Sequence, residues 1–155
     1  MKDEIKKENL NIRNTSDGKQ IFDCVRKKYV AFTAEEAVRQ NIIMYLVNVK
    51  NYPINLMRVE VGMKLNSMQK RCDILVYGSN RNPLLMVECK AENVKISQNI
   101  FYQLSRYNLI FKVPYLVATN GIDTYCCKIN FETQSYEFLN EIPIFETINI
   151  LTEIK

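Results

Sequence analysis

Two apolar segments joined by a turn-rich loop carry charged residues where buried strands ordinarily have none. The two segments are residues 71–77 and residues 84–90. Asp73 lies in the first, and Glu88 and Lys90 lie in the second. A carboxylate within an apolar strand is costly unless a partner compensates its charge. The segments therefore predict a β-hairpin that brings two carboxylates and a lysine together at a site for a cation.

The register of this hairpin follows from its loop. If residues 77 and 84 close the loop, facing residue numbers sum to 161, so that Asp73 lies opposite Glu88. Facing Cβ atoms are about 4.5–5.5 Å apart, and like charges placed in this way are destabilising. Lys90 follows Glu88 by two residues and is expected on the same face as both carboxylates.

Two chemistries are compatible with this spacing. Carboxylates without imidazole or thiolate suit Mg²⁺ or Mn²⁺, and such an ion can polarise a phosphodiester while the lysine orients a nucleophile or stabilises developing charge. The alternative is a buried Asp–Lys or Glu–Lys ion pair that binds no metal.

Composition narrows the remaining chemistry. The 155 residues include no histidine, which excludes catalytic triads and dyads with histidine and zinc sites that use it. The five cysteines are odd in number and form no CxxC pair, which favours free thiols in a reducing cytoplasm. The net charge of +4 is compatible with nucleic acid but does not establish it. No stretch is apolar enough to span a membrane, so we expect a soluble cytoplasmic protein.

The order of predicted elements indicates the fold class. A short strand over residues 21–25 precedes a helix from Thr33 to about Lys50. A strand over residues 56–65, a polar connection over residues 66–70 and the two strands of the hairpin follow. A second helix over residues 97–111 and further strands complete the order. Thr33 and Glu36 fit a capping box at the start of the first helix. We expect a single α/β domain over residues 21–155, with a central mixed β-sheet flanked by α-helices, after a polar lead-in over residues 1–20.

The second helix adds a polar pattern. Gln103 and Tyr107 stand four residues apart on its flank, beside an apolar stripe that should face the core. By itself this pattern is compatible with ordinary packing for Tyr107 and a surface position for Gln103.

Asp73, Glu88-x-Lys90 and Gln103-x-x-x-Tyr107 together resemble the PD-(D/E)xK nuclease pattern. More closely, the chain is similar to the N-terminal nuclease domain of type I restriction enzyme R subunits, in a stand-alone form. Cys72 stands where the pattern usually has proline. The segments that carry this resemblance are residues 21–30, 35–40, 71–77 and 113–121.

The resemblance implies a restriction-endonuclease-like fold and a metal-dependent deoxyribonuclease, an endonuclease rather than an exonuclease. Asp73 and Glu88 would bind Mg²⁺ or Mn²⁺, Lys90 would be the catalytic lysine, and Gln103 and Tyr107 would support them. The acidic residue of the first helix would be Glu36, and Glu60 is a further acidic candidate. A module of the same fold that binds nucleic acid or assembles with partners without catalysis is the alternative.

DNA is the expected partner, and the candidate contacts are the basic residues Arg26, Lys27, Lys28, Arg71 and Arg106. The chain has no Gly-x-x-x-x-Gly-Lys-Ser/Thr phosphate loop, so we expect motor or methyltransferase subunits to be separately encoded. A homodimer is also an expectation, since cutting both strands of a duplex generally needs two sites.

Overall fold

The computed structural model describes residue 5, residues 9–65 and residues 67–153. Two β-sheets and three α-helices are present in this part of the chain. The elements are β1 (Ile12–Thr15), β2 (Gly18–Asp23), β3 (Lys28–Ala31), α1 (Ala34–Asn48), the 3-10 helix η1 (Ile54–Leu56), β4 (Met57–Leu65), β5 (Met68–Tyr77), β6 (Pro83–Cys89), α2 (Gln98–Phe111), β7 (Tyr115–Thr119), β8 (Thr124–Asn130), β9 (Ser135–Leu139) and α3 (Phe145–Glu153).

The larger sheet has six strands in the order β4-β5-β6-β7-β8-β9. Its neighbouring strands are antiparallel except for β6 and β7, which are parallel because α2 returns the chain between them. The sheet is therefore mixed, and the predicted α/β class with a central mixed sheet flanked by helices is confirmed.

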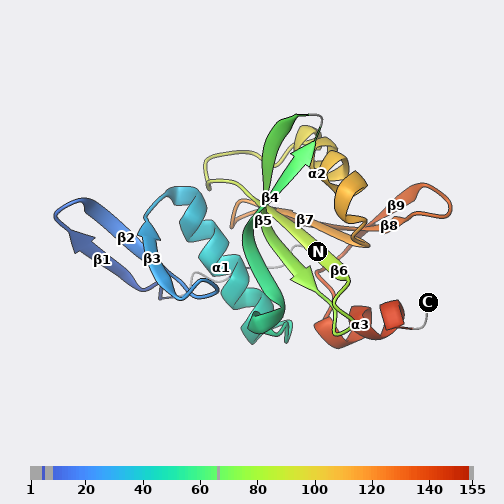
Figure 1. Cartoon of the computed structure of the whole chain (residues 1–155), viewed down its shortest axis with the longest axis horizontal. Coiled ribbons are helices and arrows are strands. Elements are labelled where there is room, and N and C mark those ends of the chain that lie inside the picture. Colours follow the sequence, from blue (N-terminus) through green and yellow to red (C-terminus); the bar gives the residue numbers. More distant parts are fainter. Residues whose placement is uncertain (1–4, 6–8, 66, 154–155) are drawn as a thin grey trace.

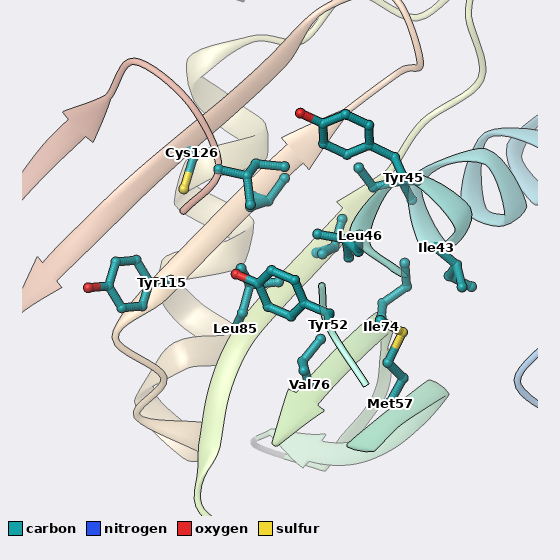
Figure 2. Close-up of a cluster of buried hydrophobic side chains, with 14 of the residues drawn as sticks. Ile43, Tyr45, Leu46, Tyr52, Met57, Ile74, Val76, Leu85, Tyr115 and Cys126 are labelled. Atoms are coloured by element: carbon teal, nitrogen blue, oxygen red, sulfur yellow. The ribbon is translucent and has the colours of Figure 1, made fainter. Parts of the chain in front are cut away.

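Strand alternation builds a separate core on each face of this sheet. On β6, Leu85 and Val87 join a cluster with α1 and α3, whereas Met86 joins a second cluster with α2. Figure 2 shows the first cluster, in which Leu46 of α1 lies over the strands. The predicted apolar stripe of α2 is present, since Ile100 and Leu104 are buried in the second cluster. Helices on both faces explain why the central strands are almost continuously apolar.

The start of α1 follows its sequence signal. Thr33 adopts an extended backbone, and its hydroxyl accepts a hydrogen bond from the Glu36 N–H at 2.9 Å. The carboxylate of Glu36 instead accepts from Arg39 at 2.7 Å and Gln40 at 2.9 Å. Only the threonine half of the predicted capping box is thus formed.

Only one strand of the smaller sheet, over residues 21–25, was expected from the sequence, and it overlaps β2. Residues 1–20 were predicted to be a polar lead-in, but β1 and β2 begin at Ile12 and Gly18 and form an antiparallel sheet with β3. In Figure 1 this sheet lies at one end of the molecule, with α1 between it and the six-stranded sheet. The proposed domain boundary at residue 21 falls within β2 and stays a prediction.

Polar and aromatic contacts explain why the sequence pattern of the small sheet was weak. The Arg13 guanidinium lies 3.7 Å from the centre of the Tyr29 ring, and its Nε donates to Gln20 at 2.9 Å. Phe22 and Tyr29 meet edge to face at 5.3 Å between ring centres. These cross-strand contacts replace the apolar alternation that marks a half-buried strand.

One further difference concerns the start of β5. Residues 66–70 were predicted to be a polar connection, but β5 already begins at Met68. Among the residues that the structure describes, no helix is long and apolar enough to cross a membrane.

The cap of α1 gives a test of the fold. We expect Thr33→Ala to lower the free energy of unfolding by about 1 kcal/mol, because the Glu36 N–H loses its acceptor. Thr33→Ser keeps the hydroxyl and should stay within about 0.5 kcal/mol of the wild type. Urea denaturation followed by circular dichroism measures both, and equal losses for the two variants would contradict the assigned cap.

Candidate active site

The β5–β6 register is the one expected from the loop. Ile74 pairs with Val87 and Leu75 with Met86, so that facing residue numbers sum to 161, and a bulge follows at the loop end. Continued by one residue, this register sets Asp73 against Glu88. The ladder stops before that position, because Asp73 Oδ2 accepts the Cys89 N–H at 2.7 Å. A side-chain hydrogen bond thus replaces the next contact between the main chains.

A third acidic residue extends this position across the sheet. On β4, Val59 pairs with Ile74 and Val61 pairs with Cys72, so Glu60 lies across from Asp73. Glu60, Asp73 and Glu88 therefore occupy one row over three adjacent strands. A row of three acidic residues requires positive charge nearby.

The two strands change face at this row. Glu60 has a positive φ of 50°, which is rare for a non-glycine residue within a strand. Val59 packs in the cluster beneath α1 while Val61 packs in the cluster beneath α2, although regular alternation would put both on one face. Ile74 and Cys72 are divided between the two clusters in the same way. The break leaves Glu60 and Asp73 directed toward α1.

Glu88 lies on β6, the strand next to this break. Its neighbours Val87 and Cys89 lie in the cluster beneath α1. Burial raises the pKa of Glu88, and Asp73 and Glu35 of α1 are close enough for both charges to raise it further. The Lys90 ammonium lies 2.6 Å from Glu88. Asp73, Glu88 and Lys90 therefore meet at the end of the strands, and their shared face stays a prediction.

Arg39 of α1 supplies the main positive charge. Its side chain is buried, and its guanidinium lies 2.7 Å from Glu36, 3.0 Å from Asp73 and 3.4 Å from Glu60. Burial alone would lower the pKa of Arg39, but the Asp73 and Glu36 carboxylates raise it above its ordinary value. Its Nε has no hydrogen-bond partner among the described residues. Arg39 of α1 therefore links this helix to β4 and β5 through ion pairs.

A second arginine extends the network to the small sheet. Arg26 binds the Asp23 carboxylate, and its Nη1 donates to Glu60 at 2.6 Å. Asp23 is fully buried and also accepts the Val25 and Arg26 N–H groups at 2.9 Å each. Arg26 was a candidate DNA contact, and the structure shows its guanidinium engaged within the protein.

Glu88 and Lys90 form the other half of the site. Lys90 Nζ donates to Glu88 Oε1 at 2.6 Å. Burial, and then the nearby charge of Asp73, raise the pKa of Glu88 to about 7 despite this lysine. Burial opposes protonation of Lys90, but the hydrogen bond to Glu88 raises its pKa. The site therefore holds an acidic group whose charge is incompletely compensated.

A divalent cation fits the carboxylates of Asp73 and Glu88 if water and substrate phosphate supply its other ligands. Within the described residues there is no cluster of three or more acidic or thiol side chains that could enclose a metal. Mg²⁺ is, however, commonly held by one or two carboxylates together with water and substrate phosphate. Asp73 and Glu88 meet that requirement, and the raised pKa of Glu88 shows that added positive charge is favourable there. The Glu88–Lys90 pair matches the metal-free alternative considered from the sequence, whereas Asp73 pairs with Arg39, which was not considered there.

The other predicted site residues differ in whether they contact the group formed by Asp73, Glu88 and Lys90. Glu36 is part of it through Arg39. Gln103 is exposed on α2 and makes no hydrogen bond with Asp73, Glu88 or Lys90 in the part of the chain described. Tyr107 also belongs to α2, and its side chain lies outside the described set. The remaining basic candidates, all exposed, are Lys27, Lys28, Arg71 and Arg106.

Three residues of this region were not found from the sequence. Arg39 follows Glu36 by three residues, a spacing that signals a helical ion pair, but its burial depends on the docking of α1. Lys64 and Lys70 lie on the β4–β5 hairpin, and Lys70 precedes the strand that was predicted to begin at residue 71.

Comparisons with known proteins identify the family and agree with the fold. A family model described as the type I restriction enzyme R protein N terminus matches residues 34–143. A solved fragment described as an HsdR subunit of a type I restriction enzyme from Vibrio vulnificus YJ016 has a similar fold, with a TM-score of 0.53 and 19% identity. The match covers 74% of this chain and 24% of that one, so the chain spans about a quarter of the fragment. No curated protein matches the chain.

The raised pKa of Glu88 predicts an unusual dependence of stability on pH. The folded-state pKa of about 7 lies above the ordinary value of 4.5, so the contribution of Glu88 to stability is full below pH 4.5 and is lost as the pH rises through 7. Without divalent cations, Glu88→Gln should therefore be more stable than the wild type at pH 8, by on the order of 2 kcal/mol.

The comparison needs reducing agent, EDTA and urea denaturation at pH 5 and pH 8. The gain should shrink toward pH 5, and Glu137→Gln, an exposed change on β9, should follow the wild type at both pH values. A Glu88→Gln protein that is less stable than the wild type at pH 8 would refute the assignment.

Removal of the Arg39 charge gives a second test of the network. We expect Arg39→Met to lower the free energy of unfolding by about 3–5 kcal/mol, because buried carboxylates lose their partner. Arg58→Met removes an exposed guanidinium from β4 and should cost less than about 1 kcal/mol. Equal losses in urea denaturation would show that the network contributes no special stability.

Proposed function

The chain belongs to the family of the type I restriction enzyme R protein N terminus, and from that premise we propose that it hydrolyses DNA phosphodiester bonds in a metal-dependent reaction, as an endonuclease. The observation that carries the proposal is the end of the β5–β6 hairpin. There Asp73 and Glu88 are adjacent in register, and the Lys90 ammonium lies 2.6 Å from Glu88. Acidic groups beside a lysine at a strand end suit phosphoryl chemistry.

Each group has a separate task in this proposal. Asp73 and Glu88 would hold Mg²⁺ or Mn²⁺, and a bound ion supplies a Lewis acid that polarises the phosphodiester and lowers the pKa of a coordinated water. Lys90 has three N–H donors and gives one to Glu88, so another can donate to the attacking water or to a phosphate oxygen. Arg39 fixes the Asp73 carboxylate, whose second oxygen is held by the Cys89 N–H.

The supporting residues act at longer range. Glu36 fixes Arg39 and Gln40, which makes it a positioning residue rather than a metal ligand in this proposal. Gln103 and Tyr107 of α2 are proposed to handle DNA beside the centre. Exposed Lys27, Lys28, Arg71 and Arg106 are proposed contacts with the phosphate backbone, since lysine and arginine supply most of that contact.

We also propose protein partners on the basis of the family to which the chain belongs. Subunits of a restriction enzyme that provide a motor or methyltransferase are proposed as separately encoded partners. A homodimer would place two centres on a duplex, as double-strand cleavage generally requires. These assemblies are not needed for hydrolysis of a single strand.

A catalytically silent module is the second candidate. The observation in its favour is that Arg39 and Lys90 already pair with Asp73 and Glu88 without a metal. Such a protein would bind DNA through its basic surface and would leave the strands intact.

Plasmid cleavage distinguishes the two functions. With Mg²⁺ or Mn²⁺, we expect the wild type to cut single- or double-stranded plasmid DNA, and Asp73→Asn and Lys90→Ala to lose about 100-fold or more in rate. Lys128→Ala, an exposed change on β8, is the matched control and should keep the wild-type rate.

The other outcomes of the plasmid experiment would contradict the nuclease proposal or expose a contaminant. Wild-type DNA binding without metal-dependent cleavage would support the silent module and sink the nuclease proposal. Equal cleavage by every variant would indicate a contaminating nuclease. Circular dichroism shows whether the inactive variants are folded.

A further inference from the structure

We propose that the hairpin groove, a hollow lined by Arg26, Val59, Glu60, Gly62, Lys64, Gln69, Lys70 and Arg71, holds the sugar–phosphate backbone of a DNA strand beside the phosphodiester to be cut. This inference deepens the proposed nuclease function and rests on it. The long β4–β5 hairpin supplies seven of the eight lining residues, and it is drawn in green in Figure 1.

The groove leads directly from the acidic row. Glu60 lines the groove, and Glu60 is across from Asp73 in the β4–β5 register. Arg71 is two residues from Asp73 on β5, and Gln69 is four residues away. At about 3.4 Å per residue these positions are roughly 7 and 14 Å along the strand. Four nucleotides of B-DNA rise about the same 14 Å along the axis.

The charge of the groove selects a polyanion. Arg26, Lys64, Lys70 and Arg71 contribute four cations, against the single carboxylate of Glu60. Arg26 is paired with Asp23 and Glu60, but no ion pair involves Lys64, Lys70 or Arg71 within the described chain. Three unpaired cations beside a proposed phosphodiester centre are suited to counterion release from DNA.

The shape of the groove also favours backbone over base contacts. It has a volume of about 760 Å³ and no aromatic lining residue, so it offers no platform on which bases could stack. Gly62 pairs with Arg71 on the neighbouring strand, and a Cβ built on Gly62 meets no atom within 4 Å. The missing side chain keeps the space beside Arg71 open. Contacts of this kind position a strand without reading its sequence.

The first test measures DNA binding separately from catalysis. A labelled duplex is titrated in EDTA, with fluorescence anisotropy read from 50 to 200 mM salt. The triple variant Lys64→Gln/Lys70→Gln/Arg71→Gln should bind at least 10-fold more weakly at 100 mM salt. Its slope of log affinity against log salt should fall in magnitude by about 2 to 3, since each lost phosphate contact removes about 0.9.

The matched control has the same composition and charge change. Arg81→Gln/Lys112→Gln/Lys128→Gln also removes one arginine and two lysines, all of them exposed and outside the groove. It should keep the wild-type affinity to within about twofold and a slope reduced by less than 1. Similar losses in both triple variants would reduce the groove to general surface charge and overturn the inference.

A single substitution tests the groove without removing a cation. Gly62→Glu adds a carboxylate beside Arg71 at a position with room for a side chain and without a positive φ. We expect it to weaken binding several-fold, whereas Gly62→Gln, of the same size but uncharged, should have a smaller effect. Equal effects of the two would show obstruction instead of electrostatics and would contradict the proposed phosphate contact.

The outcomes separate this inference from the proposed function. A wild type that cleaves plasmid DNA while the groove variants bind and cleave as it does would overturn the groove and leave the nuclease standing. Groove-dependent binding without metal-dependent cleavage would retain the groove and remove the nuclease. A wild type that neither binds nor cleaves DNA would refute both.

Discussion

The buried guanidinium of Arg39 is the interaction on which the rest of the site depends. It contacts carboxylates from α1, β4 and β5, and it is the group that unites the helix with the two strands electrostatically. Three acidic residues around one arginine would be a poor arrangement in an apolar core without it. Arg26 repeats the pattern further out and ties the small sheet to Glu60. Charge pairing, added to apolar packing, therefore sets how α1 meets the sheet.

The same pairing explains the geometry of the hairpin end. Glu60 and Asp73 can both reach α1 only because the strands change face at their row, and the positive φ of Glu60 is part of that change. Glu88 lies outside the arginine network and keeps a raised pKa. One carboxylate is thus fixed by an internal cation, while its neighbour retains unfavourable charge that a metal ion would relieve. The groove carries cations without ion pairs among the described residues, and it shares Glu60 with the acidic row, so the proposed metal centre adjoins a basic surface.

Sequence reasoning recovered the parts of this design that have local causes. The β5–β6 register followed from a short loop, and the start of α1 followed from Thr33, because both depend on neighbouring residues. Two strands of the small sheet, β1 and β3, were missed since they are held by polar and aromatic contacts without apolar alternation. The shared face expected for Asp73 and Glu88 stays a prediction, because the break in β4 and β5 at this row interrupts regular alternation. The partner of Asp73 comes from a helix 34 residues earlier, which no local pattern specifies.

The central claim is that Asp73 and Glu88 together bind a divalent cation, and crystallography with Mn²⁺ tests it most directly. Crystals soaked in Mn²⁺ and measured for anomalous scattering should show a peak between the two carboxylates, with Lys90 moved from Glu88 or retained beside it. The same crystals of Asp73→Asn should lose that peak. Wild-type crystals without anomalous density at this position, with the Arg39–Asp73 and Lys90–Glu88 pairs intact at saturating Mn²⁺, would contradict the account.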